Sequence, residues 1–273
     1  MHPRDVPVHF TNLREMSKSP LHYLTRVASP SEPTAAMRFG TLVHTLAVGG
    51  PQPIIYDGPR SGDGSRKALK AFKEAHKGVT VYMPEDIEEA RWCAESLRSN
   101  PRSAPLLVGQ HELEIDWAIG ATACSSRLDV LGDGFITEIK TASCVQPDRF
   151  RSACIGRYAY HAQLAFYRMA AAWRTIEATR AAGKVLRDVP RRECFIVGVE
   201  TRAPFDVIVF RLTERCLDAG GRLCHAWLTR LQSCLESDQW PGYAQHIIDL
   251  DDDAADDLIF DDPDSPSPGE EAA

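Results

Sequence analysis

The sequence has no apolar run near the length of a membrane-spanning helix, which needs about 20 consecutive apolar residues. The first ten residues, MHPRDVPVHF, also lack the charged segment followed by an apolar segment that marks a secretory signal. These two absences argue against a membrane protein and against a secreted one. We therefore expect a cytoplasmic protein without a membrane partner.

Cysteine pairs spaced as Cys-x-x-Cys are also absent, although the chain has eight cysteines. In a cytoplasmic chain of this size, disulfide bonds are not expected. We expect most of these cysteines to be small buried apolar residues.

Basic residues are absent from residues 249–273, which hold eleven Asp or Glu. The whole chain has 38 acidic and 31 basic residues, so residues 1–248 hold 27 acidic and the same 31 basic residues. That mildly basic body permits nucleic-acid binding without requiring it. Beyond Pro241 the apolar periodicity is lost. The pattern predicts a folded domain over residues 1–240 and a disordered acidic tail over residues 241–273.

The stretch RLDVLGDGFITEIK, residues 127–140, predicts two strands joined by a tight turn, because Asp-Gly between two β-prone runs favours a hairpin. Glu138 and Lys140 leave the same face of the second strand. A hairpin would bring Asp129 beside Glu138. Two carboxylates and an ammonium group suit a Mg²⁺ or Mn²⁺ site. An exposed hairpin with an ordinary Glu-Lys pair explains the spacing equally well.

Two further segments carry polar groups on otherwise apolar helices. His44 is the one titratable group on a stripe of the helix predicted over residues 33–48. Such a histidine is more often a hydrogen-bonded core residue than a ligand, but nearby carboxylates would favour metal binding. In a later helix, Tyr160, Gln163 and Tyr167 share one face, and a glutamine flanked by tyrosines is unusual for pure packing.

The remaining pattern predicts a mixed α/β (α+β) fold. Further strands are predicted over residues 110–117, 193–200 and 205–211. In the first of these, Glu112 and Glu114 share a face that can point towards Asp129. Further helices are predicted over residues 10–28 with a break at Ser19-Pro20, and over 65–78, 84–100 and 213–237, and two more helices are predicted within residues 145–173. The helix over residues 65–78 carries five basic residues and one acidic residue. This helix either binds DNA phosphates or forms a solvated surface.

Together these segments resemble the PD-(D/E)xK nuclease superfamily, in particular its RecB-like and RecE-like branch and the phage-type exonuclease VIII family. Phe39–His44 is similar to that branch's helix motif with its metal-binding histidine. Asp129 and the Glu138-Ile139-Lys140 triplet match the motif for which the superfamily is named, and Tyr160–Gln163 with Tyr167 is similar to its QxxxY motif. The resemblance covers roughly residues 10–235.

The resemblance implies a restriction-endonuclease-like core, in which helices flank a central mixed sheet, and metal-dependent cleavage of DNA. Mg²⁺ or Mn²⁺ would be held by His44, Asp129, Glu138, the carbonyl of Ile139 and Glu112, with Glu114 as the alternative to Glu112. Lys140 would position or deprotonate the attacking water or stabilise the oxyanion, and Gln163 and Tyr167 would orient it or hold phosphate. The residues expected to bind DNA are Arg127, Thr141, Arg149, Arg151, Arg157 and Tyr160.

Some RecB-like relatives carry an iron–sulfur cluster bound by one cysteine before the histidine motif and three closely spaced cysteines near the end. Here no cysteine precedes Cys93 and the late cysteines are widely spaced, so we predict no cluster. The Walker A motif is also absent, which excludes helicase activity from this chain.

We therefore expect an exonuclease that degrades linear duplex DNA ends, 5′ to 3′, leaving single-stranded tails for recombination. Relatives of this kind tend to form ring-shaped trimers or tetramers. An endonuclease of the same superfamily and a DNA-binding or interaction module without activity are the alternatives. The tail segment DDLIFDDPD either recruits a partner, such as a single-strand annealing recombinase, or only increases solubility or mimics DNA.

Overall fold

The computed structural model describes residues 3–30, 32–62, 64–185 and 187–243. The chain separates into two compact units, residues 1–241 and 242–273. Only Gly242 and Tyr243 of the second unit are described. The rest of the predicted disordered tail, residues 244–273, lies outside the described residues. Among the described helices, none has the length and apolar character that a membrane crossing requires.

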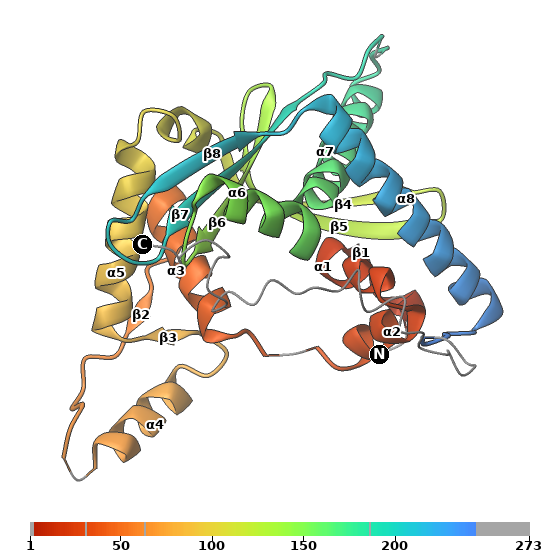
Figure 1. Cartoon of the computed structure of the whole chain (residues 1–273). Coiled ribbons are helices and arrows are strands. Elements are labelled where there is room, and N and C mark those ends of the chain that lie inside the picture. Colours follow the sequence, from red (N-terminus) through yellow and green to blue (C-terminus); the bar gives the residue numbers. More distant parts are fainter. Residues whose placement is uncertain (1–2, 31, 63, 186, 244–273) are drawn as a thin grey trace, which may run out of the picture. The chain divides into compact units, whose positions relative to one another are not determined.

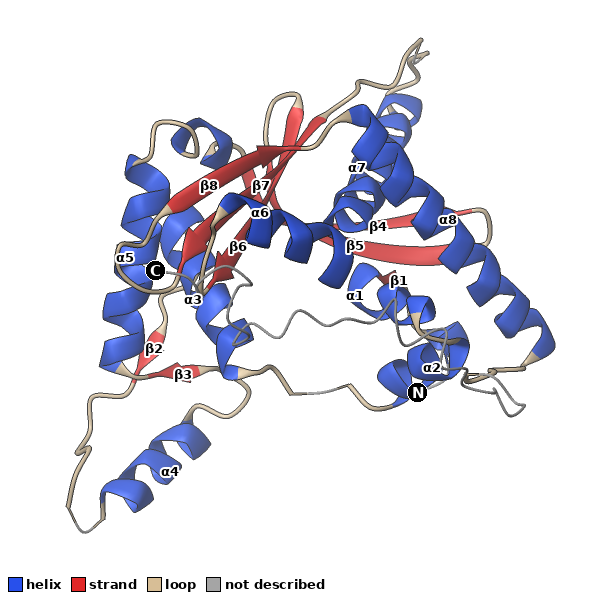
Figure 2. Ribbon diagram, viewed as in Figure 1, coloured by secondary structure: helices blue, strands red, loops and turns tan. Residues whose placement is uncertain are grey.

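A six-stranded mixed sheet forms the centre of the first unit (Figures 1 and 2). β5 pairs antiparallel with β4 and β6, β6 pairs parallel with β7, and β8 closes the sheet antiparallel to β7. The strands are β1 (Val8–His9), β4 (Gln110–Ile119), β5 (Thr122–Leu131), β6 (Phe135–Ala142), β7 (Glu193–Glu200) and β8 (Val207–Arg211). A separate parallel pair is formed by β2 (Ile54–Ile55) and β3 (Val81–Tyr82). The sequence did not predict the three two-residue strands β1, β2 and β3.

Eight α-helices lie among the described residues: α1 (Phe10–Leu13), α2 (Pro20–Ala28), α3 (Ala35–Val48), α4 (Ser65–Ala75), α5 (Pro84–Ser99), α6 (Pro147–Ser152), α7 (Tyr160–Ala181) and α8 (Glu214–Ser237). Their starts follow from local chemistry, because the side chains of Ser19, Thr34 and Thr213 each accept a hydrogen bond from a backbone N–H of the first turn. The predicted break at Ser19-Pro20 is therefore the N-terminus of α2.

Two apolar cores lie on opposite faces of the sheet. One packs β4, β5 and β6 against α1, α7 and α8 and includes Leu128, Ile136 and Phe166. The other packs α3 and α5 against the sheet through residues such as Leu42 and Ile139. Burial of these side chains on both faces fixes the register of β6, because successive strand residues point to opposite faces.

The edge of β5 that faces β6 is only partly paired. β1 pairs with Cys124 and Ser125, and β6 pairs with Val130 and Leu131. The described residues between these contacts have no strand partner on that edge. We call this gap the fork, and it is where the polar residues of the sheet gather.

Candidate active site

A groove of about 1030 Å³ lies at the fork. Ser126, Arg127 and Asp129 line it from β5, and Glu138 and Lys140 line it from β6. α3, α7 and the N-terminal segment complete its walls. The predicted hairpin therefore does bring Asp129, Glu138 and Lys140 to one cavity.

Asp129 links the two strands at the fork. The carboxylate is buried, and its Oδ2 accepts a hydrogen bond of 2.7 Å from the backbone N–H of Ile139. Burial acts to raise the pKa of Asp129, but the positive charges of His44 and Lys140 and the Ile139 N–H outweigh burial and lower it. Asp129 is therefore a carboxylate anion at neutral pH.

His44 projects from α3 towards the same point. Its Nδ1 lies 3.5 Å from Asp129 Oδ1 and 3.7 Å from Glu112 Oε1, and its Nε2 lies 3.0 Å from the carbonyl oxygen of Ile139. Burial acts to lower the pKa of His44, but the Asp129 and Glu112 carboxylates outweigh burial and raise it to about 10. Ligand atoms of His44, Glu112 and Asp129 lie within 4.8 Å of one another, so these residues can hold a divalent metal ion when His44 gives up its proton.

Glu112, and not Glu114, reaches this group. The β4–β5 register sets Glu112 opposite Asp129, and Glu112 has a φ of 47°. Its other oxygen lies 3.2 Å from Arg127 Nε. Glu114 is exposed and lines the groove farther along β4.

Glu138 is the most deeply buried acid of the site, with 2% of its surface exposed. Its Oε1 accepts hydrogen bonds from Lys140 Nζ at 2.5 Å and from Gln163 Nε2 at 2.8 Å. Its Oε2 is buried and has no hydrogen-bond partner among the described residues. Burial, followed by the charge of Asp129, raises the pKa of Glu138 to about 7, although Lys140 opposes this shift.

Lys140 is placed as a fixed positive charge. Its Nζ lies 4.5 Å from the centre of the Tyr160 ring as well as beside Glu138. Burial acts to lower the pKa of Lys140, but Glu138, Tyr160 and Asp129 outweigh burial and raise it well above its usual range. The amine therefore keeps its proton at neutral pH.

Gln163 and Tyr167 support Glu138 from α7. The Gln163 amide uses both hydrogens, one towards Glu138 Oε1 and one towards Tyr167 Oη, each at 2.8 Å. Both side chains are buried. Both residues also line the groove, and the Gln163 amide fixes the Glu138 carboxylate within it.

Tyr158 lines the groove and was not among the residues predicted from the sequence. Its ring stacks on Tyr160 with centres 5.2 Å apart, and the Arg157 guanidinium lies 5.4 Å from its centre. Ala159 between the two tyrosines is left-handed, with a φ of 52°, and a π-helical turn over Ala153–Arg157 precedes it. The sequence Arg-Tyr-Ala-Tyr is the one local signal that could have pointed to this stack.

The residues predicted to bind DNA are not all brought together. Arg127, Thr141, Arg157 and Tyr160 line the groove. Thr141, Arg157 and Tyr160 also line a neighbouring cavity of about 690 Å³, which Arg149 joins. Arg151 lines neither cavity and pairs instead with Asp148.

The helix α4 carries its basic residues on an exposed face. Arg66, Lys67, Lys70 and Lys73 are exposed, and none of them is ion-paired among the described residues. The opposite side of α4 packs half-buried apolar residues such as Phe72, whose ring meets Tyr56 edge-on. Both interpretations of this helix therefore stay open.

A forked mixed sheet that carries a buried Asp, a buried Glu and a Lys two residues after the Glu defines the PD-(D/E)xK nuclease superfamily. Residues 9–250 match the family described as a PDDEXK-like domain of unknown function (DUF3799), and the chain belongs to that family. This match confirms the predicted PD-(D/E)xK superfamily.

A solved structure supports the restriction-endonuclease-like fold. A candidate exonuclease from Eubacterium rectale is similar over 93% of each chain, with a TM-score of 0.58 and 10% sequence identity. A protein called SSO0001 aligns over 80% of this chain and 82% of its own, with 12% identity, but its TM-score of 0.27 is too low to compare folds. No curated protein matches the chain.

Proposed function

We propose that residues 1–240 form a metal-dependent exonuclease that degrades the ends of linear duplex DNA from 5′ to 3′ and leaves single-stranded tails for recombination. The observation that carries this proposal is the buried Glu138 carboxylate beside the His44, Glu112 and Asp129 group. The candidate exonuclease that shares the fold supports exonuclease rather than endonuclease action.

The residues present fit a divalent cation. Glu138 Oε2 is a buried acceptor that lacks a partner among the described residues. Glu138 lines the same groove as His44 and Asp129, which form a three-ligand group with Glu112. Carboxylate oxygens and an imidazole nitrogen are donors that Mg²⁺ or Mn²⁺ accepts, and the Ile139 carbonyl oxygen lies 3.0 Å from His44 Nε2. We assign His44, Glu112, Asp129, Glu138 and the Ile139 carbonyl to Mg²⁺ or Mn²⁺. When bound, the ion supplies Lewis acidity towards the phosphate and water.

Lys140 then acts as a cation and not as a base. An amine whose pKa is raised does not accept a proton at neutral pH. Its charge is suited to orient water and to stabilise the negative charge that develops on the phosphate oxygens. Gln163 and Tyr167 keep Glu138 and Lys140 in this arrangement.

DNA would enter along the groove and the neighbouring cavity. We assign phosphate contacts to Arg127, Thr141, Arg149 and Arg157, and a stacking or packing contact to Tyr160. Arg151 would contact only DNA that extends past the two cavities.

The test is digestion of linear duplex DNA, labelled at either the 5′ or the 3′ end, in the presence of Mg²⁺. We expect early release of the 5′ label, no release in EDTA, and a loss of rate of about 10²–10³-fold in Lys140→Ala. Asp129→Ala should lose activity as well, whereas Lys18→Ala, which removes an exposed lysine paired with Glu15, should not.

Circular duplex DNA provides the contrasting substrate. Cleavage of the circle at the rate of the linear form would identify an endonuclease. A folded wild-type protein that shows no metal-dependent cleavage of either substrate would identify a binding module instead.

We further propose a ring-shaped trimer or tetramer, which light scattering of the purified chain would test. We also propose that the acidic tail recruits a single-strand annealing recombinase. A truncated chain, residues 1–240, that still binds the recombinase would contradict this role.

A further inference from the structure

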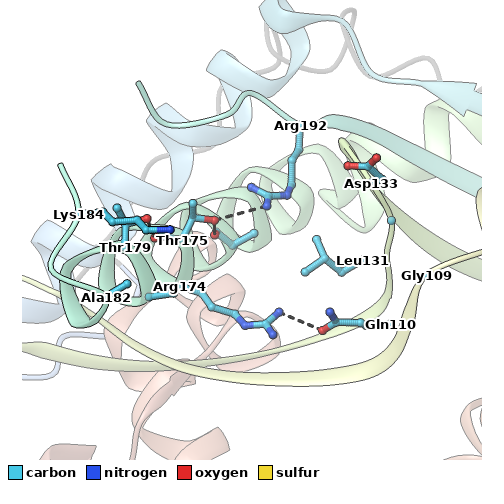
Figure 3. Close-up of a pocket in the computed structure, with 13 residues that line it drawn as sticks. Gly109, Gln110, Leu131, Asp133, Arg174, Thr175, Thr179, Ala182, Lys184 and Arg192 are labelled. Carbon is cyan, nitrogen blue, oxygen red and sulfur yellow. Dashed lines mark hydrogen bonds between the residues drawn. The ribbon is translucent and has the colours of Figure 1, made fainter. Parts of the chain in front are cut away.

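A second pocket of about 620 Å³ lies at the C-terminal half of α7 (Figure 3). We call it the basic pocket. It shares no lining residue with the groove or with the neighbouring cavity. Its polar lining comes from Gln110, Asp133, Arg174, Thr175, Thr179, Lys184 and Arg192.

Three of these side chains are cations from separate parts of the chain. Arg174 belongs to α7, Lys184 follows α7, and Arg192 immediately precedes β7. Asp133 is the one carboxylate among the described lining residues. No ion pair joins it, or any other described carboxylate, to the three cations. The pocket therefore carries uncompensated positive charge.

The two arginines bond only to neutral groups. Arg174 Nη1 donates to Gln110 Oε1 at 3.1 Å, and Arg192 Nη2 donates to Thr175 Oγ1 at 3.4 Å, as Figure 3 shows. Arg192 Nε is buried without a partner among the described residues. Each guanidinium has five N–H donors, so most of their hydrogen-bonding capacity is unused. A half-buried charge in this state is unfavourable unless an anion compensates it.

We propose that the basic pocket binds a phosphate group at a site separate from the candidate active site. Guanidinium groups match phosphate oxygens in pairs, and the volume is in the range of pockets that hold small ligands. The phosphate belongs either to a free nucleotide or to a DNA strand. The second source, a DNA strand, rests on the proposed function. In that case α7 sets the spacing between the candidate active site and the basic pocket, since Gln163 and Arg174 lie about 16 Å apart along the helix.

The test measures binding of inorganic phosphate by calorimetry in EDTA, which keeps the candidate metal site empty. We expect Arg174→Gln/Arg192→Gln to bind phosphate at least tenfold more weakly than wild type. Arg180→Gln is the matched control, because Arg180 is exposed on the same helix and is paired with Glu177. It should bind as wild type does.

A second variant keeps the test decisive if the double variant folds poorly. Ala178 is exposed and lines the pocket, so Ala178→Glu places a carboxylate among the cations. Phosphate should raise the melting temperature of the wild type and not that of Ala178→Glu. Equal phosphate affinity in wild type and Ala178→Glu, or no saturable binding by the wild type, overturns the proposal.

Two further measurements complete the test. The first distinguishes a nucleotide from a DNA strand as the source of the phosphate, and the second distinguishes failure of the basic-pocket proposal from failure of the nuclease proposal. Competition by 2′-deoxyadenosine 5′-monophosphate at lower concentration than by a single-stranded oligonucleotide assigns a nucleotide site, and the reverse order assigns a strand site. Lys140→Ala should bind phosphate like the wild type whether or not the wild type cleaves DNA. Failure of the nuclease proposal therefore leaves the result for the basic pocket readable.

Discussion

At the scale of single residues, the position of the Glu138 carboxylate depends on two donors that come from different elements. Lys140 lies two residues later on the same strand, whereas Gln163 reaches it from α7. A buried carboxylate that loses one donor keeps its desolvation cost without that compensation. We therefore expect the amide of Gln163 to position the Glu138 carboxylate.

Gln163→Leu tests this role. We expect a loss of about 1–3 kcal/mol in the free energy of unfolding and a fall in kcat, because Glu138 and the Tyr167 hydroxyl both lose the amide. Denaturant unfolding and the labelled-duplex assay measure the two effects. Gln232→Leu is the control, since Gln232 on α8 donates to Thr122 Oγ1 and neither residue lines the groove. An unchanged kcat in Gln163→Leu would contradict the positioning role.

Those candidate site residues that lie close together in the sequence could be predicted from it. Glu138 and Lys140 are neighbours on one strand face, and Gln163 and Tyr167 are neighbours on one helix face, so a local pattern reveals each pair. The choice between Glu112 and Glu114 could not be made, since it depends on the register of β4 against β5. Arg174 and Arg192 line the same pocket only because α7 packs against the start of β7, and no local sequence pattern predicts that packing.

At the scale of elements, α7 is held by very close packing against α8. A Cβ atom added at Gly220 would lie 2.3 Å from the backbone oxygen of His161, whereas one added at Gly221 would meet nothing within 4 Å. Backbone cannot move aside as a flexible side chain can. Gly220 therefore sets the distance between α8 and the start of α7, which precedes Gln163 by three residues.

Gly220→Ala and Gly221→Ala form a matched pair. We expect Gly220→Ala to lower the free energy of unfolding by about 1–3 kcal/mol, because the added methyl group overpacks the helix contact. Gly221→Ala should raise it by about 0.5–1 kcal/mol, because alanine favours a helix interior more than glycine does. Thermal unfolding measures both, and equal effects of the two changes would contradict this packing argument.

The basic face of α4 gives an electrostatic prediction. If the lysines of α4 contact DNA phosphates, the double variant Lys67→Gln/Lys70→Gln should bind DNA more weakly. The magnitude of the slope of log affinity against log salt concentration should also fall by about 1–2, since each phosphate contact contributes about 0.9 to it. Arg215→Gln/Arg222→Gln removes the same charge from exposed positions of α8 and should leave the slope unchanged. Anisotropy titrations at several salt concentrations measure it. Equal slopes in the two double variants would identify α4 as a solvated surface.

The main elements were predictable because their signals are local. The Asp133-Gly134 turn is one case, since Gly134 has a φ of 83° and Gly132 N–H donates to the Phe135 carbonyl oxygen at 3.0 Å. The strand β1 was not predictable, because two residues carry no periodicity and its pairing with β5 is distant in sequence. The fork was not predictable either, because β1 and β6 each pair with only part of the same β5 edge.

At the scale of the whole molecule, charge is divided between the basic body and the acidic residues 249–273. Removal of those residues changes the net charge from −7 to +4. We expect a chain of residues 1–248 to associate with duplex DNA about tenfold faster at low salt, with a gain that shrinks as salt rises. Stopped-flow fluorescence measures the rate.

A full-length variant with Asn and Gln in place of the eleven acids is the control for tail length. It should match the truncated chain, because the effect is electrostatic. Wild-type association rates in both proteins would show that the tail does not act through its charge.

The register of β6 has one further consequence. Glu138 faces α7, and its neighbour Ile139 faces the core beneath α3. If β6 were shifted by one residue, the Glu138 carboxylate would point into the apolar core and the Ile139 side chain would point towards the groove. Misaligned molecules would then be inert and poorly soluble at once, so the specific activity of a preparation would serve as a direct gauge of how many molecules are correctly assembled.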